Sequence, residues 1–91
     1  MAKVTKSMKN AIEKAKSTSY WHDMPAGIAR NPFSGEAIEL TAEENSLYTW
    51  TKGWYMRYCS DMPTQVPVST YDNVRYYIAA INPTAYMTLL D

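Results

Sequence analysis

The feature that most constrains the fold is a helix that the sequence predicts over roughly residues 42–60. It opens with Thr41-Ala-Glu-Glu44, a capping box in which the threonine hydroxyl accepts from the backbone of residue 44 and the glutamate reaches back to residue 41. Its large side chains cover about half of the helical circumference, whereas one neighbouring element needs a stripe about 100° wide. They are Leu47, Tyr48, Trp50, Trp54, Tyr55, Tyr58 and Cys59. We therefore expect this helix to pack on two sides and to form the centre of the fold.

A chain of 91 residues is long enough for one domain and no more. Eight Tyr, three Trp and one Phe bury large areas per residue, which lets a small core hold together. Tyr hydroxyls need water or a polar partner, so the excess of Tyr over Phe favours half-buried positions and interfaces. We expect a single domain over residues 1–91, with an aromatic-rich helical core over residues 41–91.

The first sixteen residues are basic and the remainder of the chain is acidic. Five lysines against Glu13 give the first part a net charge of +4, and four basic residues against eight carboxylates give the second part −4. Residues 2–18 are predicted to be an amphipathic helix whose thin apolar stripe consists of Val4, Met8, Ala11, Ile12 and Ala15. We expect this basic N-terminal helix, within residues 1–18, to fold back on the acidic body or to reach an acidic partner.

The lysine-rich face of this helix has several interpretations, with Lys6 and Lys9 as candidate contact residues. The first is a solvated surface, which is the usual role of such a face. Nucleic-acid binding is unlikely because the segment has no Arg, which leads in phosphate recognition. Membrane binding is disfavoured because the apolar side lacks Trp, Phe and Leu. Docking on a protein partner remains open.

The other elements are predicted from turn and cap signals. Turn formers at Asn31-Pro32 and Ser34-Gly35 suit a short β-hairpin within residues 28–40, or a structured loop. Residues 61–68 are expected to be extended, and Ser69-Thr70-Tyr71-Asp72 resembles a second capping box before a helix over roughly residues 71–81. Asn82-Pro83 then starts a final short helix. The predicted fold is a mainly α, small helical domain of about four helices with at most one short β-hairpin.

Residues that carry catalytic or metal chemistry are scarce, which predicts a protein that is not an enzyme and needs no cofactor. One His and one Cys fall short of a zinc ligand set. A nucleophile pair of Cys59 and His22, oriented by Asp23, is formally available, but a buried inert thiol is the more common role of such a cysteine. The acidic pair Glu36 and Glu39 is expected to be solvated on the hairpin, and we keep it as a candidate contact surface for a basic groove.

A second set of candidate contact residues comes from the surplus of aromatic and sulfur side chains. Tyr76 lies opposite the apolar stripe of its helix and beside Arg75, and Met56 lies opposite the aromatic face of the central helix. Exposed Tyr and Met suit a protein interface, although isolated exposed apolar residues are also ordinary. Tyr20 and Trp21 fall in an irregular segment, where we expect Trp21 to pack under the first helix or against a partner.

Two stretches of the chain resemble short, uncharacterised proteins of tailed bacteriophages. They are residues 31–50 (NPFSGEAIELTAEENSLYTW) and residues 69–91 (STYDNVRYYIAAINPTAYMTLLD). The shared features are an Asn-Pro-x-Ser/Thr-Gly turn, a Leu-Thr step into an aromatic-rich helix, and a C-terminal helix that ends in a Pro-containing turn and a Leu-rich tail. The resemblance implies a phage origin and carries over no catalytic residues.

These observations predict a non-enzymatic small phage protein that acts by protein–protein contact as a minor virion or assembly component. An alternative is a host-directed inhibitor of a bacterial enzyme or defence protein, and a third is an oligomer that sequesters a nucleotide-like ligand. No long apolar segment or signal peptide is apparent, so we expect the host cell cytoplasm or the assembled virion as the location. Expected partners are a phage structural protein or a host protein, or a second copy of this chain.

Overall fold

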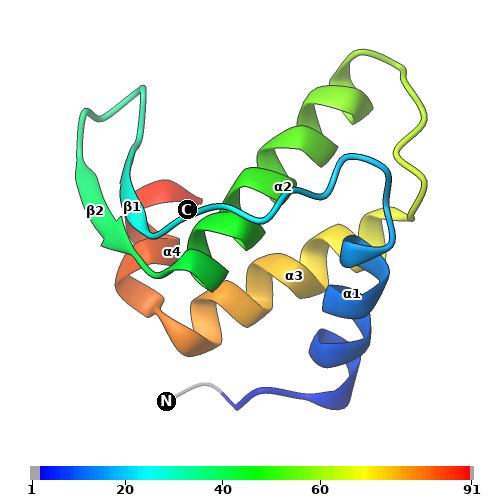
Figure 1. The fold of residues 1–91 in the computed structure, drawn as a ribbon, viewed down its shortest axis with the longest axis horizontal. Coiled ribbons are helices and arrows are strands. Elements are labelled where there is room, and N and C mark those ends of the chain that lie inside the picture. The colour runs from blue at the N-terminus through cyan, green and yellow to red at the C-terminus, as the bar shows by residue number, and fades with distance from the viewer. Residues whose placement is uncertain (1–2, 91) are drawn as a thin grey trace.

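Four helices and one antiparallel hairpin account for the regular structure of residues 3–90, which the computed structural model describes (Figure 1). The helices are α1 (Lys6–Lys16), α2 (Ala42–Cys59), α3 (Val68–Ile81) and α4 (Pro83–Leu89). The strands are β1 (Gly27–Arg30) and β2 (Ala37–Leu40). The expected mainly α class, with about four helices and one short hairpin, is confirmed.

Helix α2 begins at the predicted capping box. The backbone N–H of Glu44 donates to the Thr41 hydroxyl over 3.2 Å, and the backbone N–H of Thr41 donates to the Glu44 carboxylate over 2.9 Å. Its wide apolar face is only partly buried: Tyr55, Tyr58 and Cys59 are exposed. The buried side chains of α2 belong to two separate clusters, one with α1 and α3 and one with the hairpin and α4, so its packing on two sides is confirmed, and only the exposed side chains near its end depart from the prediction.

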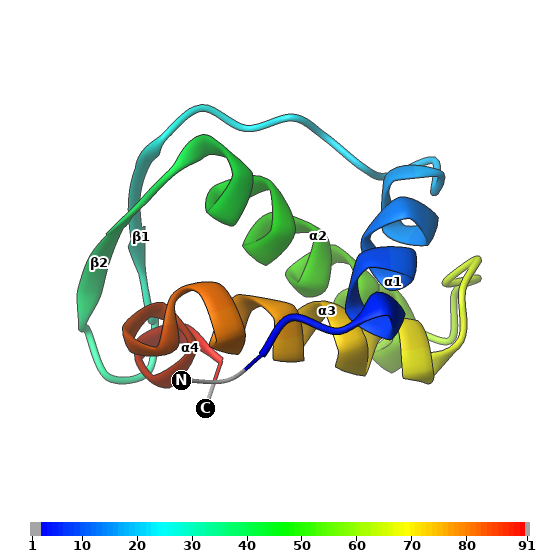
Figure 2. The same cartoon turned by 90° about the horizontal axis from the view of Figure 1, so that it is seen from below.

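The centre of the fold is α3 rather than α2. Helix α3 contacts α1, α2 and α4, whereas α2 contacts α3 and the two strands (Figure 2). Val74 and Ile78 of α3 are almost fully buried. They belong to the main core, whose buried members also include Ala11, Ile12, Ala15, Tyr20, Leu47, Trp50 and Trp54. A fourteen-residue helix with apolar side chains on several sides can hold three neighbours, which explains its position.

The linker over residues 17–26 crosses α2 on its way from α1 to the hairpin (Figures 1 and 2). Tyr20 stacks on Trp50 with ring centroids 5.9 Å apart, and the Tyr20 hydroxyl donates to the Thr64 carbonyl. The Trp50 indole N–H donates to the Thr18 hydroxyl over 2.9 Å. The linker therefore closes the core over the middle of α2 and satisfies its buried polar atoms.

The hairpin packs against α4 and the start of α2. Its strands pair with Gly27 opposite Leu40 and Arg30 opposite Ala37. Gly35 has φ +76, the left-handed conformation that glycine adopts without strain. A second cluster of buried side chains links the three elements and consists of Ala29, Leu40, Tyr48 and Ala85. This cluster fixes the hairpin to the helices, so the hairpin tip has a defined place on the surface.

Three predicted boundaries differ from the structure. Helix α1 begins at Lys6 rather than at residue 2, which lies outside the described residues, because Thr5 acts as the N-cap and accepts from the Met8 backbone. Its last turn ends at Lys16, since the Ser17 and Thr18 hydroxyls bond to helix carbonyls.

Helix α3 begins earlier than predicted, at Val68, and its N-cap is Pro67. The second capping box is therefore wrong, because its first two residues already lie in the first turn of the helix. Residues 61–67 form no strand; Asp61 and Gln65 have positive φ angles. The Asn82 cap is confirmed, since its side chain accepts from the Ala85 backbone.

Candidate binding groove

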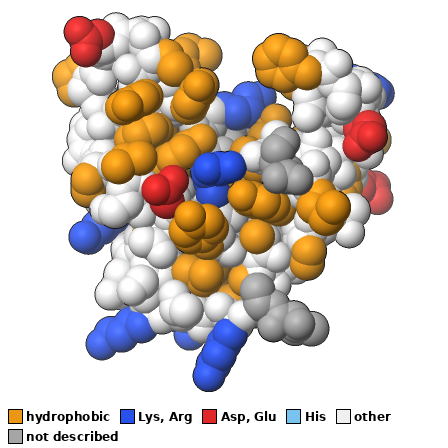
Figure 3. Space-filling model, turned by 180° about the vertical axis from the view of Figure 1, so that it is seen from behind, with side chains coloured by type: hydrophobic (Ala, Val, Ile, Leu, Met, Phe, Trp, Pro, Cys, Tyr) orange, Lys and Arg blue, Asp and Glu red, His pale blue; other side chains and the backbone are white. Residues whose placement is uncertain are grey.

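A groove with a volume of about 470 Å³ lies between the hairpin tip and the helices α2, α3 and α4. Figure 3 shows hydrophobic side chains gathered across one face of the molecule, around a hollow between two lobes of the surface. The groove is lined by Asn31, Pro32, Phe33, Tyr48, Thr51, Lys52, Tyr55, Met56, Tyr71, Arg75, Leu89 and Leu90. Its walls therefore come from three helices and from the turn of the hairpin.

The rim of the groove carries exposed large apolar side chains. Phe33 is 97% exposed at the hairpin tip, and Met56 and Tyr55 of α2 are 67% and 55% exposed. The turn holds Phe33 outward because the Asn31 side chain accepts from the Phe33 backbone and donates to the Thr88 carbonyl of α4. Large apolar side chains that gather around a hollow are typical of contact surfaces, whereas scattered ones are ordinary.

Two tyrosines line the inner part of the groove. Burial raises the pKa of both Tyr48 and Tyr71 above the ordinary tyrosine value, so both hydroxyls stay neutral at physiological pH. The Tyr71 ring stacks on Trp54 with centroids 4.4 Å apart and on Tyr55 with centroids 6.5 Å apart. These stacked rings connect the inner wall of the groove to Trp54 of the main core.

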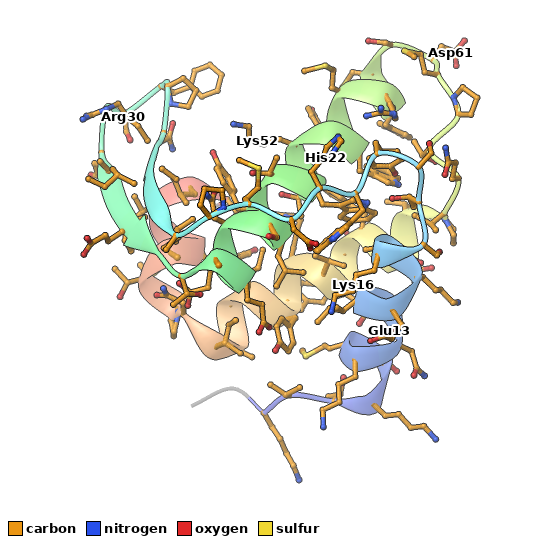
Figure 4. All side chains as sticks on the ribbon, viewed as in Figure 1. Glu13, Lys16, His22, Arg30, Lys52 and Asp61 are labelled. Carbon is orange, nitrogen blue, oxygen red and sulfur yellow. The ribbon has the colours of Figure 1, made fainter. Side chains whose placement is uncertain are left out.

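Two cations lie in this otherwise apolar surface. Lys52 projects from α2 toward the hairpin (Figure 4), and its ammonium lies 4.9 Å from the centroid of the Tyr48 ring. The Arg75 guanidinium donates to the Leu90 carbonyl over 2.9 Å and lies 5.6 Å from the centroid of the Tyr71 ring. Its Nε is buried and has no hydrogen-bond partner within residues 3–90. Among the described residues, none of the side chains that line the groove is acidic.

The structure brings two of the predicted contact residues into the groove, Met56 and Arg75. Tyr76 is half exposed, as expected, but it does not line the groove. Tyr20, a residue of the linker, is buried against Trp50, so it is not available as a contact residue on the surface. Trp21 packs partly against the core, and its indole N–H donates to the Asp23 carboxylate.

The charged candidates lie on other surfaces. Glu36 and Glu39 are exposed, and Glu39 lines a separate depression beside Thr41. Lys6 and Lys9 are exposed on α1, which packs on α3 through its buried apolar stripe. The basic arm therefore folds back on the body through its apolar side, and its lysines remain in water.

Sequence reasoning missed most of the groove residues that the fold brings together, among them Phe33, Lys52 and Tyr55. One signal was available, because the only Phe of the chain lies in the centre of a Pro-Phe-Ser-Gly turn, where no core position is expected. Lys52 and Tyr55 carry no such signal. In the sequence both look like ordinary residues of a long helix. Only the folded structure shows that the hairpin tip lies opposite them.

The remaining chemical candidates do not meet at a site. His22 is exposed on the linker, and Cys59 is exposed at the end of α2, which corrects the expectation of a buried thiol. Within the described residues, no group of three or more His, Cys, Asp or Glu side chains is placed to hold a metal ion. Over the same residues, none of the helices combines the length and the hydropathy that a bilayer crossing requires.

The groove offers noncovalent binding, with apolar area for affinity and two cations for orientation. Its neutral tyrosine hydroxyls can donate to an occupant without repelling an anion. Comparisons with protein-family models, with curated proteins and with solved structures found no match for this chain.

Proposed function

We propose that this chain is a non-enzymatic binding protein that acts by protein–protein contact through the groove. The occupant is a partner segment that presents apolar side chains and a carboxylate. The observation that carries the proposal is the composition of the groove. Over residues 3–90, its lining combines apolar side chains and an exposed rim with two cations and no acidic side chain.

The residue types of the groove support a protein partner. Tyr, Met, Phe and Arg are enriched at protein interfaces, and this groove presents all four. Fully burying a side chain such as Phe33 or Met56 contributes about 1.5–3 kcal/mol, which a partner would supply. Phe33 contributes almost none of this to the isolated chain because it is 97% exposed.

The cations support an acidic group in the occupant. Arg75 lines the groove, so a carboxylate of the occupant placed beside its guanidinium would gain a charge-assisted hydrogen bond. Lys52 extends the positive region toward the hairpin, so a partner segment with one acid and flanking apolar residues matches the groove along its length.

The resemblance to short tailed-phage proteins supports a phage structural protein as the partner, and hence a virion or assembly role. A host protein is the alternative, in which case the chain acts as an inhibitor. A nucleotide-like ligand is a further alternative occupant, because the groove joins aromatic rings to two cations.

Site-specific photo-crosslinking in infected cells tests the proposal. A benzophenone amino acid is placed at Phe33 in the groove rim and, as a matched control, at Ile28, which is 73% exposed but does not line the groove. We expect crosslinks to one protein from position 33 and none from position 28. Mass spectrometry of the crosslinked peptide should identify a segment with apolar residues and an Asp or Glu.

The identity of the crosslinked protein separates the alternatives. A virion protein supports the assembly role, a single host protein supports inhibition, and a second copy of this chain shows self-association. Equal crosslinking from both positions would contradict the groove as the contact surface. Absence of crosslinks together with thermal stabilisation by a nucleotide would replace the protein partner with a small anionic ligand.

A further inference from the structure

A second, smaller pocket lies between α1 and the first turn of α3. Its volume is about 220 Å³, and it is lined by Ser7, Asn10, Ala11, Lys14, Ser69, Thr70 and Asn73. It shares no residue with the groove, and its lining is mostly polar. At about 30 Å³ for each water molecule, the pocket has room for a small ion and its first waters. Hydroxyl, amide and ammonium groups surround it, and none of its lining residues is acidic.

The pocket lies at a helix N-terminus whose backbone donors are incompletely satisfied. Pro67 is the N-cap residue of α3 and has no side chain that accepts a hydrogen bond. The backbone N–H groups of Thr70 and Tyr71 point to the Pro67 carbonyl, whereas those of Val68 and Ser69 have no acceptor within residues 3–90. Free N–H groups and the helix dipole together attract anions to such an end.

The Thr70 hydroxyl is an independent indication of a ligand. Thr70 is only 4% exposed, yet its hydroxyl makes no hydrogen bond within the described residues. The other three buried hydroxyl residues each donate to a backbone carbonyl; they are Thr18, Ser46 and Thr51. The Thr70 oxygen is not among the fully buried atoms without a partner, and the residue lines the pocket, so the hydroxyl keeps contact with solvent there.

We propose that this pocket binds a phosphate group. The N–H groups of α3 and the Thr70 hydroxyl donate to the phosphate oxygens, and the Lys14 ammonium on α1 neutralises their charge. The Ser7 and Asn10 side chains supply further donors from the same face of α1 as Lys14. A phosphate group suits this lining because it has only acceptor oxygens, whereas a cation would find no carboxylate.

An amide-resolved NMR titration tests the site with two probes, inorganic phosphate and adenosine 5′-monophosphate, at constant ionic strength. We expect saturable shifts of the Val68, Ser69 and Thr70 amides with at least one probe. Tighter binding of inorganic phosphate would identify the free ion as the ligand, and tighter binding of the nucleotide would identify a phosphate monoester. Non-saturable shifts with both probes would overturn the proposal.

Two variants test whether phosphate binds in the pocket or is only attracted to the basic helix in general. Thr70→Val keeps the side-chain shape and removes only an unpartnered hydroxyl, so it should fold and weaken binding about tenfold, the ratio for one hydrogen bond to a charged group. Lys14→Gln should weaken binding similarly, whereas Lys16→Gln, an exposed position outside the pocket, should not. Equal binding by all three variants would refute the pocket. Because the groove is unaffected by these changes, the result is independent of the protein-binding proposal.

Discussion

Helix α2 has one face that the rest of the chain covers and one face that borders the groove. On the covered face, Trp50 and Trp54 are 1% and 2% exposed, and their indole N–H groups donate to the Thr18 hydroxyl and the Val66 carbonyl. On the groove face, Tyr55 and Met56 are more than half exposed. Both faces carry large apolar side chains in the sequence. The apolar content of a helix therefore does not tell which face serves folding and which serves binding.

The difference between the faces follows from the connecting segments. The linker over residues 17–26 and the loop over residues 61–67 each place one polar acceptor beside an indole of α2. The hairpin tip approaches the other face, but it presents Phe33 to solvent rather than to the helix. The apolar side chains of the covered face are therefore buried in the isolated chain, whereas those of the groove face stay exposed until an occupant binds.

Truncation of the covered face should have the largest effect. Trp50→Ala removes a fully buried indole that stacks on Tyr20, and such a change costs about 3–5 kcal/mol of unfolding free energy. Small domains have about 5–15 kcal/mol in total, so the variant should be largely unfolded in moderate urea. Urea titration followed by circular dichroism measures the loss. A loss below about 1 kcal/mol would show that the covered face is not the core.

The elements that local chemistry determines were predictable from sequence. The Thr41 to Glu44 capping box and the Asn82 cap each need only a few adjacent residues, so their positions were correct. The start of α3 was wrong because Pro67 at the N-cap outweighed the Ser and Thr residues that follow it. Proline restrains its own φ, so the helix begins directly after it without a side-chain cap.

The candidate groove was not predictable because it depends on contacts between distant residues. Arg75 could be assigned to a contact surface, but its bond to the Leu90 carbonyl and the approach of the hairpin tip depend on tertiary packing. Tyr20 was kept as a candidate contact residue because its neighbours indicate a loop. The linker crosses α2 and buries the ring on Trp50, which no local pattern records.

A smaller effect is expected from removal of the Thr18 hydroxyl on the covered face, which accepts from the Trp50 indole and donates to the Ala15 carbonyl. Thr18→Val leaves the Trp50 indole N–H without its acceptor in a buried position, which costs about 1–3 kcal/mol. The matched control is Ser17→Ala, whose hydroxyl makes the same kind of bond to a helix carbonyl but is exposed. Urea unfolding of both variants measures the difference. Equal stability of the two would show that the indole finds another acceptor.

Alkaline pH should lower the unfolding free energy because tyrosines of both faces ionise. Burial raises the pKa of Tyr20 beside the covered face and of Tyr48 beside the groove, so the neutral hydroxyl is favoured in the folded chain. This contribution is complete below the unfolded tyrosine value of about 10 and is lost as pH rises through the higher folded values. We expect the unfolding free energy to fall as the pH rises above about 10.

Single Tyr→Phe variants assign this pH effect to a face. Tyr48→Phe removes one titrating group without removing a hydrogen bond of the described residues, so it should reduce the slope of stability against pH and leave stability at neutral pH nearly unchanged. Tyr20→Phe should reduce the slope as well, but it also removes the bond to the Thr64 carbonyl and so lowers stability at neutral pH. An unchanged slope in both variants would assign the effect to other groups.

The smallest effect on stability should come from the groove face, and it separates the two faces most sharply. Phe33→Ser combined with Met56→Ser removes two side chains that are 97% and 67% exposed, so the unfolding free energy should change by less than about 0.5 kcal/mol.

The same double variant should reduce binding of anilinonaphthalene sulfonate, an aromatic anion that suits an apolar groove with two cations. The control is Met87→Ser, which is 68% exposed on α4 but does not line the groove, and it should retain dye binding. A loss above about 1.5 kcal/mol in the double variant would mean that the groove walls stabilise the fold, and the distinction between the two faces of α2 would then fail.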